Sequence, residues 1–199
     1  PPGGVEWRPF GNTAKRQLAW CAYLLPYLEQ GPLFAQLRLD TPFDSPANAG
    51  PAATVLPVFL CPSSLRTSPV VEGRGACDYG GLFGERMTSP NDPPKGALVY
   101  DRAFRAGEIS DGLSTTIFVS EDSGSVDGQW INGRNLFDQA YPIGRAPAFE
   151  NDMRSEHPGG VNALLGDGAA RFVRESITRA ALAAVCTRAG DEPVAADDL

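Results

Sequence analysis

The hydrophobic pattern near the start of the chain has the spacing of an amphipathic helix. Its apolar positions are Leu18, Cys21, Leu24, Leu25 and Leu28. Thr13 is well placed to cap this helix, and Pro26 is expected to break or kink it. A short second helix is expected after Gly31, because Pro32 suits the first position of a helix. The chain is therefore expected to begin with a kinked pair of helices.

The next segments predict a loop and then a strand at the edge of a sheet. Residues 41–53 are rich in Pro, Ala, Asn and Gly, a composition typical of loops. An apolar run follows from Val55 to Cys61 and contains Pro57. Because proline cannot donate to a central ladder of hydrogen bonds, this run predicts an edge strand.

The second half of the chain predicts an antiparallel sheet with long loops. Residues 96–100 and 115–120 have strand composition, and turn residues occur around them at 91–94, 111–112 and 127–128. Residues 161–165 and 169–173 flank Gly166-Asp167-Gly168 and predict a β-hairpin whose turn uses Asp167-Gly168 for positive φ angles. A final helix is expected to begin at Ser176 or Thr178 and to stop at Gly190. This order of elements predicts an α+β fold.

Composition limits the size, the partners and the location of the protein. The chain has 199 residues, of which 42% are hydrophobic, enough for one domain over residues 1–199. A net charge of -7 without any basic run excludes the footprint of a nucleic-acid or anionic-membrane binder. No apolar run is long enough for a membrane helix. The opening Pro1-Pro2-Gly3-Gly4 resembles no signal peptide or natural start, so an upstream segment is expected to have been removed.

Four cysteines predict disulfides and argue against zinc. They are Cys21, Cys61, Cys77 and Cys186, and no two of them form a C-x-x-C pair. None lies near the single histidine at the usual spacing of metal ligands, so no metal site is expected. Among the three possible pairings, Cys61 with Cys77 and Cys21 with Cys186 is preferred. Buried free thiols in a cytosolic protein are the alternative.

His157 restricts the catalytic designs open to the chain, because it is the only histidine. It can pair with Asp167 or Glu121 as an acid-base couple, or its ring can donate to a backbone carbonyl and hold the turn before the hairpin. We favour the structural role, because no G-x-S-x-G motif or other nucleophile accompanies the histidine. In the same way, Asp111 and Gly112 are expected to form a capped turn before a strand.

Two kinds of binding site remain open in the loops. Oxygen ligands for calcium are available from Asp111, Asp127, Asp152 and Asp167, although no EF-hand pattern fixes their geometry. The segment most like a ligand-binding surface contains Trp130, Asn132, Arg134 and Asn135.

The run from Ser155 to Val173, in which nine residues separate His157 from Asp167-Gly168, closely resembles the signature of the bacterial prepilin-type H-x9-DG family of unknown function. Residues 24–30, 58–63 and 109–121 resemble other recurrent blocks of that family, in the same order. Cys21 and Cys77 lie outside the family pattern. The resemblance implies a pilin-like head in which an N-terminal helix packs on an antiparallel sheet. It also implies a leader and a hydrophobic helix upstream, ending near a segment similar to Pro1-Pro2-Gly3-Gly4.

The function expected from this resemblance is non-catalytic. It is the role of an exported, pilin-like surface protein that packs with itself or with other pilin-like subunits in filament or cell-envelope assembly or in adhesion. The protein would be extracellular, at the cell surface, or on the periplasmic face of the envelope, and would meet the membrane only through the upstream helix. The alternative is an extracellular glycan- or peptide-binding module that uses the 122–153 loops, with calcium as a possible aid. A hydrolase using His157 with a carboxylate is the least favoured.

Overall fold

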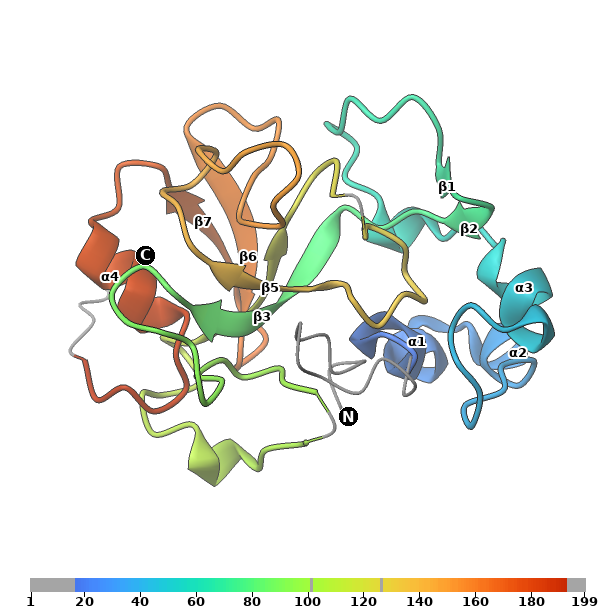
Figure 1. Ribbon diagram of the computed structural model, residues 1–199, viewed down its shortest axis with the longest axis horizontal. Helices are drawn as coiled ribbons and strands as arrows, with labels where there is room; N and C mark the ends of the chain where they lie inside the picture. The colour runs from blue at the N-terminus through green and yellow to red at the C-terminus, as the bar shows by residue number, and fades with distance from the viewer. Residues whose placement is uncertain (1–16, 101, 126, 193–199) are drawn as a thin grey trace.

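A five-stranded sheet forms the centre of the protein (Figure 1). The computed structural model describes residues 17–100, 102–125 and 127–192. The strand order is β5-β3-β4-β6-β7, and the strands are β3 (Tyr79–Glu85), β4 (Ile117–Glu121), β5 (Leu136–Gln139), β6 (Gly160–Leu165) and β7 (Ala170–Arg174). β3 pairs antiparallel with β4 but parallel with β5. The sheet is therefore mixed, which corrects the expected antiparallel sheet within a correct α+β class.

Short helices lie at both ends of this sheet (Figure 1). At one end are α1 (Trp20–Leu24), η1 (Leu25–Leu28), α2 (Gly31–Phe34) and α3 (Pro46–Ala52), together with the small β1 (Val70–Val71) and β2 (Arg74–Gly75) pair. At the other end is α4 (Arg179–Val185). Two single-turn helices, η2 (Pro57–Phe59) and η3 (Ala106–Glu108), occur in the connections. Within the described residues, no helix has the length and hydrophobicity needed to cross a bilayer.

The N-terminal helices agree in part with the sequence pattern. α1 ends at Leu24, and Pro26 lies in the 3₁₀ turn that follows, as a helix-breaking proline should. α2 has Pro32 in its first turn, as expected. The expected cap Thr13 and the opening Pro1-Pro2-Gly3-Gly4 lie outside the described residues.

Three expectations for the connecting segments are wrong. Residues 46–52 form helix α3 instead of a loop, with Pro46 in the first turn, where its missing N–H costs nothing. The apolar run from Val55 to Cys61 forms the 3₁₀ turn η2 instead of a strand. Residues 96–100 do not form the expected strand, although Gly96 and Leu98 donate backbone hydrogen bonds to the carbonyls of Phe83 and Leu82 in β3.

The hairpin and the last helix follow the predictions closely. β6 and β7 pair antiparallel, with Val161 opposite Val173, and both side chains are buried. Gly168 has φ of 88° in the turn, whereas Asp167 does not have the positive φ that was expected for it. α4 begins after Thr178, whose hydroxyl accepts a hydrogen bond from Ala181 N at 3.2 Å. The helix ends at Val185, earlier than expected.

The sequence pattern did not predict β3, because three of its seven residues are glycines, which weaken strands. A Cβ atom on Gly80 would lie 2.7 Å from the Phe137 ring, and one on Gly81 would lie 2.5 Å from Leu136 Cδ2. Both neighbours belong to β5. The glycines are therefore needed because the β5 side chains fill the space beside β3.

Candidate functional site

Three chemically different side chains from distant parts of the sequence converge at the end of β4. The sulfur of Cys61 lies 3.4 Å from His157 Nε2, and the same nitrogen lies 3.1 Å from Glu121 Oε1. All three atoms lie within 4.8 Å of one another. Among the described residues, no other group of three or more His, Cys, Asp or Glu side chains brings its ligand atoms together in this way. We refer to Cys61, Glu121 and His157 as the Cys-Glu-His cluster.

Cys61 is held in place by the buried carboxylate of Asp78. Asp78 Oδ2 accepts a hydrogen bond from Cys61 N at 3.0 Å, and Asp78 N donates to the Phe59 carbonyl at 2.9 Å. The other oxygen, Oδ1, forms an ion pair with Arg66 Nη2 at 2.7 Å and accepts from Ser64 Oγ. The turn that carries Cys61 is thus fixed to the start of β3.

Glu121 is the last residue of β4, and its side chain is 1% exposed. While Oε1 faces His157, Oε2 accepts hydrogen bonds from Asn162 N at 2.7 Å and from Asn162 Nδ2 at 3.3 Å. These bonds offset the cost of burying a carboxylate and fix its orientation. They also connect Glu121 to β6, the next strand in the sheet.

His157 reaches Glu121 because the segment before it lies beside the end of β4. Arg154 N donates to the Glu121 carbonyl at 3.1 Å, and Arg154 forms a parallel bridge with Asp122. Ser155 Oγ then accepts from His157 N and donates to the Gly160 carbonyl, which closes the turn before β6. The His157 side chain is 27% exposed, so the cluster opens to solvent on the histidine side.

A second ion pair supports the same segment. Arg154 Nε lies 3.2 Å from Asp122 Oδ1, and the Asp122 side chain is 1% exposed. Burial raises the pKa of Asp122 to about 7, although the Arg154 guanidinium acts in the opposite direction. Removing two charges from water costs about as much free energy as their mutual attraction returns. This pair therefore mainly positions the segment before His157.

The geometry of the cluster does not match a nucleophilic relay. In a Cys-His-carboxylate relay, the thiol and the carboxylate contact opposite nitrogens of the imidazole. Here the Cys61 sulfur and Glu121 Oε1 both face Nε2. Burial also raises the pKa of the Cys61 thiol, with Glu121 acting in the same direction, which disfavours the thiolate. A hydrolase that uses His157 gains no support from this arrangement.

The two halves of the sequence motif are separated in space. Asp167 lies at the end of β6 opposite to His157, where its side chain accepts a hydrogen bond from Ala169 N at 2.9 Å within the hairpin turn. Of the two carboxylates considered as partners for His157, the structure therefore brings only Glu121 to it. The spacing of nine residues corresponds to the length of β6 with its flanking turns.

Asp111 and Gly112 form the expected turn, but the carboxylate caps a different part of the chain. Gly112 has φ of 98°, a conformation that glycine adopts without strain. Asp111 Oδ2 accepts from Thr187 Oγ1 at 3.0 Å and from Gly190 N at 2.7 Å, and Oδ1 accepts from Asp191 N. Asp111 thus holds the segment after α4 against the turn before β4.

The expected disulfides are not formed, and all four cysteines are free and buried. Cys61 faces His157, whereas Cys77 lies with its sulfur 3.9 Å from that of Cys21. Cys186 belongs to a separate core cluster built around α4 and the β6-β7 hairpin. Spacing along the chain suggested the pairing, but the turn at Asp78 directs Cys61 and Cys77 to different neighbours.

The proposed calcium ligands do not meet. Asp127 accepts a hydrogen bond from Asn132 Nδ2, and Asp152 accepts from the backbone N–H groups of Ala140, Tyr141 and Met153. Asp111 and Asp167 are occupied by other backbone groups, as described above. In the part of the chain that the structure describes, these four aspartates form no shared group of ligands.

The segment expected to form a binding surface is instead inside the protein. Trp130 is fully buried, and its Nε1 donates to the Thr54 carbonyl at 2.9 Å. Asn132 and Asn135 are also buried, and Asn135 Nδ2 donates to the Tyr79 carbonyl at 2.8 Å. Arg134 is half-buried. These polar side chains organise a core loop, which accounts for their binding-like composition.

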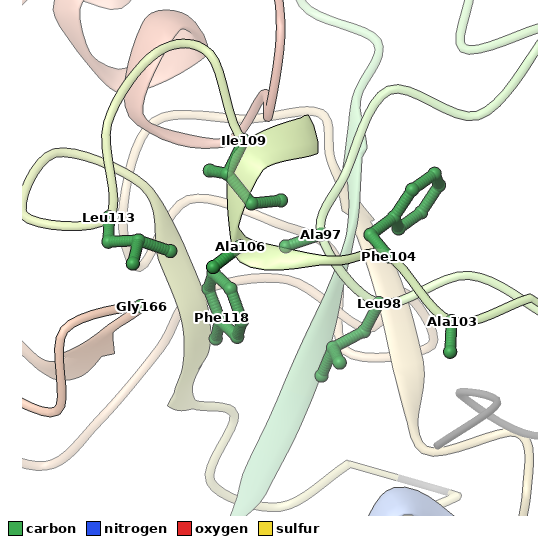
Figure 2. A pocket seen from close by; sticks show the side chains of 9 residues that line it. All are labelled: Ala97, Leu98, Ala103, Phe104, Ala106, Ile109, Leu113, Phe118 and Gly166. Atoms are coloured by element: carbon green, nitrogen blue, oxygen red, sulfur yellow. The ribbon is translucent and has the colours of Figure 1, made fainter.

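A small apolar pocket lies near the start of β4 (Figure 2). Its volume is about 200 Å³, and it is lined by Ala97, Leu98, Ala103, Phe104, Ala106, Ile109, Leu113, Phe118 and Gly166. The lining residues come from residues 97–113, from Phe118 in β4 and from Gly166 in the turn after β6 (Figure 2). None of the lining side chains is polar, so the pocket offers little to orient a ligand.

Comparison with protein families identifies the chain. The family model SBP_bac_10, described as a protein of unknown function (DUF1559), matches residues 1–180. The chain belongs to the DUF1559 family. Neither the curated proteins nor the solved structures contain a match to it. For this DUF1559 protein the site residues must therefore be judged from their own geometry.

The sequence of this DUF1559 chain predicted a pairing of Glu121 with His157, but not the position of Cys61 beside them or its hydrogen bond to Asp78. Cys61 is 96 residues from His157 and was considered only as a disulfide partner. The block at residues 58–63 was the one available signal, because it resembled a recurrent family segment around Cys61. Nothing in the sequence connected Asp78 with that block.

Replacing His157 by alanine is expected to lower the free energy of unfolding of the DUF1559 chain by about 1–2 kcal/mol, because buried Glu121 loses a hydrogen-bond partner. This corresponds to a decrease in Tm of about 2–8 °C, measured by thermal unfolding in the presence of a chelator. Asp167→Ala is the control and should cost less, since Asp167 accepts its bond in an exposed turn. An unchanged melting curve for His157→Ala would contradict a structural role.

Proposed function

We propose that this chain is the non-catalytic head of an exported pilin-like surface protein. In this role it packs against copies of itself or against other pilin-like subunits, at the cell surface or on the periplasmic face of the envelope. The proposal is supported by the H-x9-DG resemblance and by the use of the motif residues. Glu121 and His157 join β4 to the turn before β6, and Asp111 fixes the segment after α4. These contacts stabilise the fold, and the Cys61 thiol in the cluster is not activated as a nucleophile.

The observation that carries the proposal is an uneven distribution of exposed apolar side chains. Most of the large hydrophobic residues that are exposed in the described chain belong to residues 27–70, namely Tyr27, Leu39, Val55, Val58, Leu65 and Val70. Tyr27 is 84% exposed and Leu65 is 78% exposed. In Figure 1 this segment includes α2 and α3 and forms the end of the molecule opposite α4.

Side chains of this kind favour association. Each Å² of apolar surface that a contact buries contributes about 25 cal/mol before the costs of ordering are subtracted. The net charge of -7 opposes the approach of identical copies. At physiological salt the Debye length is about 8 Å, so this repulsion acts only at short range. Association is therefore expected to strengthen when salt is raised from low to physiological concentration.

Introducing positive charge on this segment tests the proposal. The double variant Val58→Lys with Leu65→Lys should weaken self-association at least about tenfold, because a lysine cannot be buried in an apolar contact without a partner. Sedimentation equilibrium of the natural chain and the variant gives the two association constants. Phe149→Lys is the matched control, since Phe149 is 75% exposed but lies outside residues 27–70. A natural chain that stays monomeric, or a control that is weakened equally, would count against the proposal.

A further inference from the structure

We propose that the Cys-Glu-His cluster is a binding site for Zn²⁺. Its ligand atoms would be Cys61 Sγ, Glu121 Oε1 and His157 Nε2, one each of sulfur, oxygen and nitrogen. The proposal goes beyond the assembly function and does not depend on it. It also departs from the expectation of no metal site, which relied on spacing along the sequence.

Two of the three separations within the cluster are close to those around a tetrahedral zinc ion, and the third, between Cys61 Sγ and Glu121 Oε1, is at most 4.8 Å. Zinc bonds of about 2.3 Å to sulfur and about 2.0–2.2 Å to nitrogen or oxygen place sulfur and nitrogen about 3.6 Å apart and nitrogen and oxygen about 3.4 Å apart. The observed separations are 3.4 Å between Cys61 Sγ and His157 Nε2 and 3.1 Å between His157 Nε2 and Glu121 Oε1. Small side-chain movements are enough to seat the ion.

A bound zinc ion would explain why Cys61 and Glu121 both face the same nitrogen of the His157 imidazole. A hydrogen-bonded relay uses both nitrogens of the imidazole ring. Metal ligation uses the lone pair of one nitrogen, which must be directed at the ion together with the ligand atoms of the other residues. Nε2 is the atom that faces both Cys61 and Glu121. The approach of Cys61 and Glu121 to the same nitrogen argues against a nucleophilic relay, but it is the arrangement that a cation bound by all three residues requires.

The neighbouring residues hold two of the ligands in position. Glu121 Oε2 is occupied by the backbone and side-chain N–H groups of Asn162, which leaves Oε1 as the free ligand atom. Asp78 accepts from Cys61 N and is itself paired with Arg66. Such outer contacts are common around protein-bound zinc, because they fix the ligands before the metal arrives.

The donor set distinguishes zinc from calcium and magnesium. Both of those ions prefer oxygen ligands, whereas zinc combines thiolate, imidazole and carboxylate. Binding releases the thiol proton of Cys61 to solvent, so that one thiolate and one carboxylate neutralise the charge of the ion. With three protein ligands, the fourth position is left for water, which can enter beside the partly exposed His157.

Titration of the metal-free chain with Zn²⁺ tests the site. Isothermal calorimetry should give one zinc ion per chain, and Tm should rise by about 5–10 °C at a free zinc concentration of a hundred times Kd. Ca²⁺ and Mg²⁺ should cause no such rise. Titration with Co²⁺ should produce the charge-transfer absorption of a thiolate-cobalt bond, which reports directly on Cys61.

Conservative variants assign the ligands. Cys61→Ser and Glu121→Gln keep the side-chain size, and each should weaken zinc binding by more than about a hundredfold. His157→Asn changes the partly exposed member and serves if either buried variant fails to fold. Cys186→Ala and Asp167→Asn are the matched controls and should bind as the natural chain does.

Two results would overturn the proposal. One is the absence of both zinc binding and a cobalt-thiolate band in the folded natural chain. The other is a band that persists in Cys61→Ser but disappears in Cys77→Ser, which would assign the metal to the neighbouring Cys21 and Cys77 sulfurs. Neither result would alter the self-association measured for the Val58 and Leu65 variants, so the two proposals can fail separately.

Discussion

Replacing Asp78 by alanine is expected to lower the free energy of unfolding by about 3–5 kcal/mol, the usual cost of removing one partner of a buried ion pair. The Asp78 side chain is 1% exposed, and that of Arg66 is 13% exposed. The variant leaves Arg66 without its carboxylate and Cys61 N without its acceptor. Denaturant unfolding of the metal-free chain measures the loss.

A surface ion pair provides the control for Asp78. Arg86 lies 2.6 Å from Glu150, and its side chain is 42% exposed, so Arg86→Ala should cost less than about 1 kcal/mol. If Asp78→Ala also lowered the free energy of unfolding by less than about 1 kcal/mol, the carboxylate would not hold the Cys61 turn. Asp78→Ala should also weaken zinc binding, since it releases the backbone that presents Cys61.

Replacing Trp130 by alanine is expected to lower the free energy of unfolding by about 3–5 kcal/mol, because it leaves a large cavity and an unpaired carbonyl at Thr54. Trp130 packs in the core cluster that joins the N-terminal helices to the sheet. A Cβ atom on Gly75 would lie 2.7 Å from Trp130 Nε1, which shows how closely the indole is enclosed. Thermal and denaturant unfolding should both show the loss.

Phe149→Ala tests whether this effect depends on burial. Phe149 is 75% exposed, so its replacement should change stability by less than about 0.5 kcal/mol. If Trp130→Ala were equally mild, Trp130 would be a surface residue and the ligand-binding interpretation of residues 130–135 would regain its basis.

The elements that the sequence predicted well are those fixed by local chemistry. The β6-β7 hairpin follows from the two short runs, residues 161–165 and 169–173, that flank the turn at Asp167-Gly168, and Thr178 caps α4 as its side chain allows. The α+β class follows from the same local patterns. In each case, the residues that decide the structure lie within a few positions of one another.

The elements that were missed depend on distant neighbours. β3 contains Gly80 and Gly81, residues that are uncommon inside strands, and their place in this strand depends on the side chains of β5 that fill the space beside them. The parallel pairing of β3 with β5 likewise joins segments more than fifty residues apart. Trp130 resembled a ligand-binding residue because its neighbours are polar, but those polar groups satisfy the backbone of a buried loop.

The candidate site was half visible in the sequence. His157 and Glu121 were considered together because a histidine needs a polar partner, and the structure brings them within 3.1 Å. Cys61 was assigned to a disulfide, since its spacing from Cys77 was the only local relation available. Cys61 is positioned near His157 by the hydrogen bond from its backbone N–H to Asp78, and no sequence pattern predicts that hydrogen bond.

Assembly through residues 27–70 can be tested most directly by cross-linking at single positions. The four native cysteines are buried, so a bifunctional maleimide should react mainly with a cysteine introduced at the surface. We expect Leu65→Cys, in the apolar segment, to yield covalent dimers at physiological salt, and Phe149→Cys, outside it, to remain monomeric under the same conditions. Equal yields at the two positions, or no dimers at either, would contradict assembly through this segment.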